Sequence, residues 1–230
     1  PLSRQDRPKQ LLRLFGGKSL LRIAFERLFG LLPAEQIYVI TGKSYLPAIA
    51  AELPEIPPEN LFGEPCPRDT APAVGLAAHL IARRDPQGTM GVFTADHVIQ
   101  PVEQFRETVA RGYAVAERYP NSLVTFGIKP TGPHTGYGYI HRGQDLDTDT
   151  FEISSFKEKP DRLTAGMYVA SGEYYWNSGM FVWQVPTIIA QFDKHQPEMS
   201  GELRTVAAEL HEPSRSKAVL ERFSKVARIS

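Results

Sequence analysis

The chain has 230 residues, of which 42% are hydrophobic and 23% are charged. This length and composition fit one sizeable α/β domain or two small ones, and they exclude collagen-like, disordered and disulfide-scaffold proteins. Lys plus Arg is 26 and Asp plus Glu is 26, so the formal net charge is zero. The sequence therefore lacks the basic excess typical of proteins that bind nucleic acids or acidic membranes.

Cysteine content and hydropathy limit the cellular setting. Cys66 is the only cysteine, so neither an intrachain disulfide nor a cysteine-based zinc site can form, and we expect a cytoplasmic protein. Apolar stretches such as 75–82 are too short to span a membrane, and the first twenty residues lack the zones of a signal peptide. The first residue is Pro1, which indicates processing or a start within a longer gene product.

Helices alternate with short apolar strands in the first half of the chain. In order, the pattern predicts a helix over 18–31, a strand over 36–41, a helix over 44–53, a strand at 61–62, a helix over 71–84, a strand over 90–94, a helix over 102–118 and a strand over 123–128. Asp69 or Thr70 is the candidate N-cap of the 71–84 helix. This alternation favours a mostly parallel sheet covered on both faces, with ligands beyond the carboxyl ends of its strands.

The second half of the chain differs from the first in composition and in hydrophobic pattern. Residues 134–159 are rich in Gly and Tyr and predict a hairpin or lid added to the sheet. Residues 186–226 are mostly helical in pattern, with 211–217 as the expected loop.

Several short motifs fail when their spacing is counted. Gly-Lys-Ser occurs twice, but the earlier glycine of a phosphate-binding P-loop falls on Leu12 and Ile37. Gly136 and Gly138 begin a dinucleotide fingerprint whose third glycine position is His141. The sequence has no Gly-x-Ser-x-Gly motif and no paired histidines at metal-binding spacing, so hydrolase and zinc-enzyme functions have no support.

Asp96 directly follows a predicted apolar strand. A carboxylate at a strand end suits Mg²⁺ shared with substrate phosphates. The alternative is that Asp96 caps the next turn, which is common after a strand. The residues alone leave both interpretations open.

Two later segments have residue types that bind phosphates and sugars. In Phe-Lys-Glu-Lys-Pro (156–160), a lysine can hold a phosphate while Glu158 accepts hydrogen bonds from a sugar, or the segment is simply a solvated strand edge. In Tyr-Tyr-Trp-Asn-Ser-Gly-Met-Phe (174–181), Asn177 can both donate to and accept from hydroxyls, whereas most of the aromatic residues belong to the core.

Two further positions have a binding and a purely structural interpretation. Gly138 offers a backbone N–H to a hydroxyl or makes a tight turn. Lys9, with Arg4 and Arg7 around Pro8, forms an anion clamp or a solvated basic arm.

Six segments, taken in order, resemble the mannose-1-phosphate guanylyltransferases: PLSRQDRPKQLL (1–12), EPCPRDTAPA (64–73), TADH (94–97), FGIKPTGPHTGYGYI (126–140), FKEKPD (156–161) and YYWNSGMFVW (174–183). The resemblance implies one Rossmann-like α/β nucleotidyltransferase domain over residues 1–230, with a mixed, mostly parallel sheet flanked by helices. It implies Mg²⁺-dependent conversion of mannose 1-phosphate and GTP to GDP-mannose and pyrophosphate. From the charge balance and the short apolar stretches we expect no nucleic-acid or membrane partner, and a homo-oligomer is possible.

The resemblance also assigns catalytic and sugar-binding roles. Lys9 would steady the nucleotide phosphates, and Asp96 would be the metal carboxylate. Lys159 would hold the sugar phosphate. Mannose would be bound by three further residues, Gly138, Glu158 and Asn177.

The nucleoside would contact Arg68, Asp69, Thr70 and Ala71. The family usually has Asn where this chain has Asp69, and a carboxylate accepts hydrogen bonds but cannot donate them. Choice of base is therefore open at this position.

In the family, a glycine-rich phosphate loop precedes the segment at 1–12, and a second metal-binding Asp lies beyond the last residues of this chain. The resemblance thus implies a domain truncated at both ends. Two alternatives remain: a transferase for another sugar phosphate or base, and a non-catalytic regulatory subunit.

Overall fold

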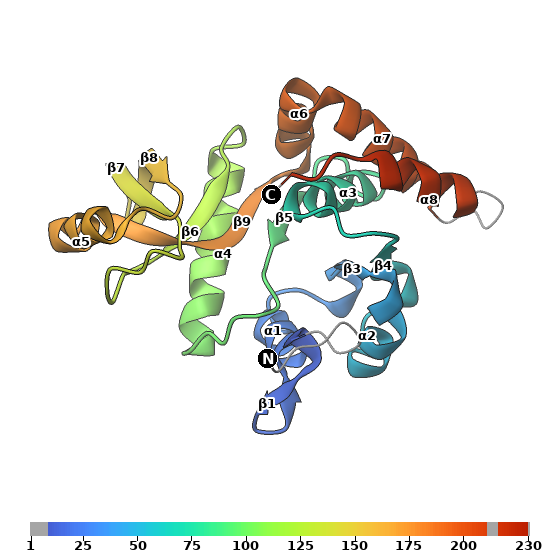
Figure 1. Cartoon of the computed structure of the whole chain (residues 1–230), viewed down its shortest axis with the longest axis horizontal. Coiled ribbons are helices and arrows are strands. Elements are labelled where there is room, and N and C mark those ends of the chain that lie inside the picture. The colour runs from blue at the N-terminus through green and yellow to red at the C-terminus, as the bar shows by residue number, and fades with distance from the viewer. Residues whose placement is uncertain (1–8, 211–215, 230) are drawn as a thin grey trace. The chain divides into compact units, whose positions relative to one another are not determined.

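The structure, a computed structural model, describes residues 9–210 and 216–229 (Figure 1). The chain divides into two compact units. Unit 1 comprises Pro1–Leu123 and Val182–Ser230, and unit 2 comprises Val124–Phe181. Each unit is described by itself.

Unit 1 contains most of the helices. They are α1 (Leu20–Leu28), α2 (Leu46–Glu52), α3 (Thr70–Ala82), α4 (Val102–Arg118), α6 (Val185–His195), α7 (Pro197–Glu209) and α8 (Ser216–Lys225). Its strands are β1 (Arg13–Phe15), β2 (Lys18–Ser19), β3 (Val39–Gly42), β4 (Leu61–Glu64) and β5 (Thr89–Val92). Short 3₁₀ turns occur at η1 (Lys9–Leu11), η2 (Ala34–Gln36), η3 (Lys43–Tyr45) and η4 (Pro58–Asn60).

Unit 2 is mainly β-structure with one helix. Its elements are β6 (Val124–Ile128), β7 (Tyr139–Asp147), β8 (Thr150–Lys157), α5 (Arg162–Ser171) and β9 (Tyr174–Gln184). From Val182 onward, β9 belongs to unit 1.

The sheets contain both parallel and antiparallel pairs. β3 and β4 are parallel, with Gly42 opposite Glu64 at their carboxyl ends. The largest sheet has the order β5-β9-β7-β8, and β6 also pairs with β9. β7 is antiparallel to both β8 and β9. The predicted mixed α/β fold with flanking helices is confirmed.

The core of unit 1 lies between β4 and helices α3, α7 and α8. Leu76 and Leu80 of α3 pack in one cluster with Leu203 of α7 and Phe223 of α8. A Cβ at Gly75 would lie 2.7 Å from Leu203, so the glycine permits α3 and α7 to approach closely. Burial of these apolar faces supplies the main stabilisation of the helical layer.

The core of unit 2 is aromatic. Tyr139 and Trp176, on neighbouring strands, pack with Ala165 of α5. The rings of Tyr168 and Tyr174 stack with centroids 3.8 Å apart, so α5 is fixed to β9.

Most predicted elements of the first half are present with shifted ends, and the 134–159 hairpin is confirmed as β7 and β8. The helix expected over 18–31 is shorter, because Ser19 Oγ accepts from the Arg22 N–H at 3.0 Å and caps α1 at its start. Helix α5 was not predicted. The loop expected over 211–217 lies largely outside the described residues. None of the described helices is long and apolar enough to cross a membrane.

Candidate functional site

Four residues singled out from the sequence lie together in unit 2, and we call them the β8–β9 cluster: Gly138, Glu158, Lys159 and Asn177. Main-chain hydrogen bonds assemble the cluster. The Asn177 N–H donates to the Gly138 carbonyl at 2.8 Å, and the Lys159 N–H donates to the Tyr137 carbonyl at 3.2 Å. The loop before β7 is thereby joined to the end of β8 and to β9.

Gly138 leaves space that two neighbouring side chains occupy. A Cβ at this position would lie 2.7 Å from Glu158 Oε2 and 2.7 Å from the Phe156 ring. The bare backbone therefore gives the Glu158 carboxylate room to lie against the loop.

The Asn177 amide has a defined orientation. Its Oδ1 accepts from the Gly179 N–H at 3.3 Å, and the Thr125 hydroxyl lies 3.1 Å from the same oxygen. The Thr125 hydroxyl also lies 3.0 Å from the Met180 carbonyl, so its single proton is shared between two acceptors. Because Oδ1 is engaged, Nδ2 is the part of the amide that can donate to a ligand.

Lys159 stands just beyond the end of β8 in a left-handed conformation, with φ of 42°. This conformation is uncommon for a residue with a side chain. Its ammonium lies 3.3 Å from Glu158 Oε1, and both side chains are more than half exposed. For residues 156–160 we considered a solvated strand edge as an alternative. Strand β8 in fact ends at Lys157, and Glu158 and Lys159 beyond it form a charged, solvent-accessible pair.

The second group of predicted residues lies in unit 1, and we call it the Lys9–Asp96 pair. Lys9 Nζ lies 2.6 Å from Asp96 Oδ2, and the Asp96 side chain is 30% exposed. Asp96 is in the turn 94–97, which follows β5. Within this turn Thr94 Oγ1 and His97 Nδ1 are 3.0 Å apart.

Electrostatics keep Asp96 ionised. Partial burial alone would raise the pKa of the Asp96 carboxyl, but the hydrogen bond and charge of Lys9, aided by His97, lower it overall. A partly exposed carboxylate suits Mg²⁺, which usually binds one or two carboxylates together with water and phosphate oxygens. The described residues contain no group of three or more potential metal ligands, so any metal here would take its remaining ligands from elsewhere.

The predicted nucleoside segment, from Arg68 to Ala71, is connected to the C-terminal part of the described chain. Thr70 begins α3, and Asp69 occupies the N-cap position without capping through its side chain. Instead, Asp69 Oδ2 lies 3.4 Å from Arg228 Nε. Arg68 donates to the Ser224 carbonyl, and the Ala71 N–H donates to the Ile229 carbonyl at 2.9 Å.

Sequence reasoning missed two polar residues, one in contact with the β8–β9 cluster and one at the end of a strand in unit 1. Thr125 contacts Asn177, although the 123–128 strand gave no signal beyond its apolar character. Glu64 ends β4, and burial raises the pKa of its carboxyl to about 7. Its place at the carboxyl end of a strand was the available signal.

The chain belongs to the nucleotidyl transferase family, whose pattern it matches over residues 1–217. It is similar to mannose-1-phosphate guanylyltransferases of Escherichia coli (41% identity over 206 residues) and Klebsiella pneumoniae (42% over 207 residues), in each case over 86% of this chain and 43% of the relative. It also resembles the solved structure of mannose-1-phosphate geranyltransferase from Thermus thermophilus, with 33% identity and a TM-score of 0.86. That match covers 100% of this chain and 64% of the other.

The chain therefore spans less than half the length of the curated relatives that it matches. The family and fold are established by these matches.

Proposed function

We propose that this chain is the nucleotidyltransferase domain of an enzyme that converts mannose 1-phosphate and GTP to GDP-mannose and pyrophosphate. The observation that carries the proposal is the β8–β9 cluster, in which an amide donor, a carboxylate and an ammonium are assembled beside the bare backbone of Gly138. Hydroxyls of a sugar and the phosphate attached to it match those groups. The similarity to mannose-1-phosphate guanylyltransferases supports mannose as the sugar.

In this proposal, the cluster binds and orients the sugar phosphate. Asn177 Nδ2 donates to a sugar hydroxyl, and the Glu158 carboxylate accepts from one. The Lys159 ammonium holds the phosphate, as an exposed cation beside a sugar site can. The Lys159 ammonium then leaves Glu158 in part for the phosphate, so substrate binding exchanges one ion pair for another.

The proposed reaction requires no protein nucleophile. A phosphate oxygen of mannose 1-phosphate forms a bond to the α-phosphorus of GTP, and the bond from that phosphorus to the bridging oxygen of the β-phosphate breaks. The leaving group is pyrophosphate. Catalysis then depends on in-line positioning and on neutralising the charge on the phosphoryl oxygens.

The Lys9–Asp96 pair can supply positive charge for that neutralisation in two ways, from the Lys9 ammonium itself and from a cation held by the Asp96 carboxylate. We propose that Lys9 binds the triphosphate and that Asp96 holds Mg²⁺, which when bound would offset the charge of the phosphate oxygens. Arg68, Asp69, Thr70 and Ala71 would form the nucleoside contact. A cytoplasmic setting, with its supply of nucleotides, belongs to the same proposal and is supported by the single cysteine.

The test is pyrophosphate release by the full-length protein with Mg²⁺. GTP, UTP and dTTP are each paired with mannose 1-phosphate and with glucose 1-phosphate. Release confined to GTP with mannose 1-phosphate is the expected result. Preference for another pair would replace the substrate and keep the reaction, whereas binding of sugar nucleotide without release from any pair would favour a regulatory subunit.

A further inference from the structure

Arg27, in the last turn of α1, is a buried cation that is only 1% exposed. Nη1 donates to the His97 carbonyl at 3.0 Å and Nη2 donates to the Thr94 carbonyl at 3.2 Å. The guanidinium carbon also lies 4.6 Å from the centroid of the Phe105 ring. These contacts attach α1 to both ends of the turn that contains Asp96.

The environment of Arg27 makes its burial unfavourable in free energy if the side chain only fills space. Among residues 9–210 and 216–229, no carboxylate pairs with its guanidinium, and Nε has no hydrogen-bond partner. Burial of a cation among neutral groups is unfavourable compared with burial of an apolar side chain of similar volume. An apolar side chain, however, could not bind two carbonyl oxygens in a fixed planar geometry.

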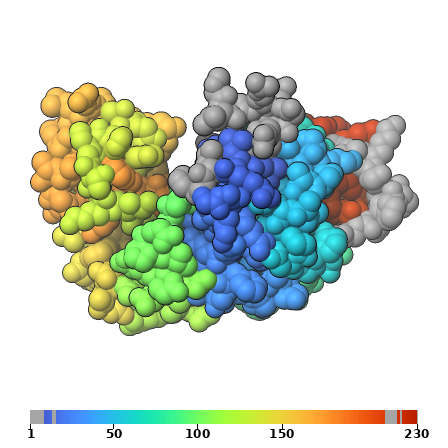
Figure 2. Space-filling model, turned by 90° about the horizontal axis from the view of Figure 1, so that it is seen from below, coloured from blue at the N-terminus to red at the C-terminus, as the bar shows by residue number. Residues whose placement is uncertain are grey.

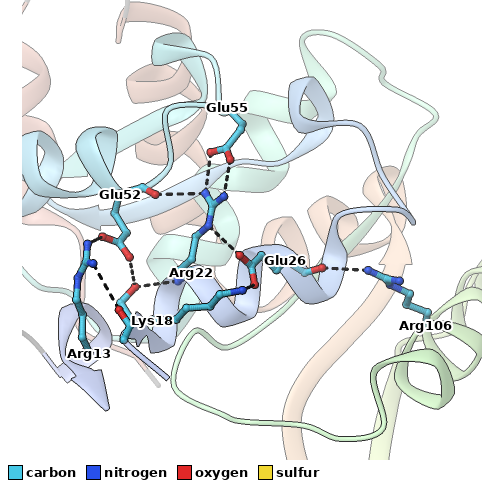
Figure 3. A network of polar contacts seen from close by, with 9 residues as sticks. Arg13, Lys18, Arg22, Glu26, Glu52, Glu55 and Arg106 are labelled. Atoms are coloured by element: carbon cyan, nitrogen blue, oxygen red, sulfur yellow. Dashed lines mark hydrogen bonds and ion pairs between the residues drawn. The ribbon is translucent and has the colours of Figure 1, made fainter. Parts of the chain in front are cut away.

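The helix that carries Arg27 is itself held in place at this end. Arg106 of α4 donates from Nη2 to the Glu26 carbonyl at 3.1 Å (Figure 3). Its Nε donates to the Arg27 carbonyl at 3.2 Å. It also donates to the Phe29 carbonyl. These bonds satisfy carbonyls that a helix end leaves free. In Figure 2 the green surface of α4 adjoins the blue surface of the N-terminal segment, in agreement with these contacts.

We propose that Arg27 is a positioning residue, which holds the 94–97 turn so that the Asp96 carboxylate keeps its direction toward Lys9 and the substrate phosphates. Thr94 and His97 flank Asp96 on either side, and fixing both of their carbonyls restricts the peptide units between them. Arg27 itself touches neither substrate nor metal in this proposal. The catalytic consequence rests on the proposed function, whereas the hold on the turn does not.

The experiment compares Arg27→Met with Arg22→Met in the full-length protein. Arg22 is on the same helix, but its guanidinium pairs with Glu26 and Glu55 and donates to the Glu52 carbonyl, none of which belongs to the 94–97 turn (Figure 3). Amide hydrogen exchange of the peptide spanning 93–98 should be about tenfold faster in Arg27→Met and unchanged in Arg22→Met. Equal exchange in the two variants would overturn the proposal whatever the activity.

The second measurement is the affinity for GTP in the presence of Mn²⁺ and in the presence of EDTA, obtained by calorimetry. The ratio of the two affinities is the gain that Mn²⁺ provides. Arg27→Met should reduce that gain and kcat by about tenfold to a hundredfold, with metal-free GTP affinity and the KM for mannose 1-phosphate nearly unchanged. Faster exchange with an unchanged Mn²⁺ gain would overturn the positioning role. If the wild-type protein releases no pyrophosphate, the proposed function fails, and the exchange and Mn²⁺ results still decide the role of Arg27.

Arg27→Lys is a milder substitution that keeps the test possible if Arg27→Met does not fold. A lysine can donate to one carbonyl but lacks the planar fork, so this variant should show exchange and Mn²⁺ gain between those of wild type and Arg27→Met. If Arg27→Met does not fold, Arg27→Lys is compared with Arg22→Lys by the same two measurements. Identical behaviour of the two lysine variants would refute the proposal.

Discussion

The Lys9–Asp96 pair and the β8–β9 cluster hold their polar groups by different means. The turn with Asp96 is fixed by a side chain, the buried guanidinium of Arg27. The β8–β9 cluster is fixed by main-chain hydrogen bonds and by the absence of a side chain at Gly138. The position of Asp96 should therefore be sensitive to substitutions in α1, a helix that is far from it in the sequence. The β8–β9 cluster should be sensitive to substitutions that alter its own backbone or add atoms beside Gly138.

The largest expected effect tests the charge in the first region. Asp96→Ala should lower turnover by about a hundredfold to a thousandfold and remove most of the gain in GTP affinity that a divalent cation provides, with metal-free GTP affinity changed much less, because the carboxylate is proposed to hold the cation that offsets charge on the phosphate oxygens. Steady-state kinetics and calorimetry measure the two quantities. Asp145→Ala, on an exposed part of β7, is the control. An unchanged rate for Asp96→Ala would remove Asp96 from the site.

A steric test sharpens the description of the second region. Gly138→Ala places a methyl group against Glu158 and Phe156 and should raise the KM for mannose 1-phosphate by about tenfold to a hundredfold. The matched control is Gly136→Ala, because a Cβ at Gly136 meets nothing within 4 Å. Equal effects of the two substitutions would mean that the loop, rather than the Glu158 contact, matters.

A smaller effect is expected from the hydroxyl beside Asn177. Thr125→Val removes a neutral hydrogen bond that helps to orient the amide, so the KM for mannose 1-phosphate should rise by about threefold to tenfold. Thr108→Val is the control, because the Thr108 hydroxyl donates to Gln104 within α4. A change in the KM for GTP instead would contradict an assignment of Asn177 to the sugar.

The smallest expected effect concerns a histidine in the helical core, outside both regions, and is an effect on stability. Burial lowers the pKa of His79, which lies 3.3 Å from Ser200 in unit 1. The unfolded chain then binds more protons than the folded chain below the ordinary histidine pKa of about 6.5, so the free energy of unfolding falls as the pH falls through that range. His79→Gln should flatten this slope in urea titrations at a series of pH values. A slope that persists would assign the acid sensitivity to other groups.

Local patterns account for what the sequence predicted well. The apolar spacing over 71–84 and 102–118 is a property of neighbouring residues, and it predicted α3 and α4 with small errors at the ends. Residues of the β8–β9 cluster could be named from their chemistry and from a family resemblance. Their mutual placement depends on the pairing of β7 with β9, which no local pattern specifies.

The remainder depends on contacts between distant segments. Arg27 lies within a predicted amphipathic helix and would pass for a solvated residue, because its acceptors in the 94–97 turn are far away in the sequence. Asp69 was one of two N-cap candidates with Thr70 and does occupy the N-cap position of α3, but its carboxylate forms an ion pair with Arg228 instead of capping the helix. In both cases, long-range partners override the local preference.

The ion pair of Lys9 with Asp96 gives this turn an internal counter-ion. The polypeptide neutralises the carboxylate before any divalent ion arrives, so the turn does not need metal in order to fold. Domains that use zinc as a structural element behave in the opposite way and unfold when it is removed. Under the proposed Mg²⁺ dependence, removal of divalent cations would therefore abolish activity while the protein stays folded, and restoring the ions would restore activity without new synthesis.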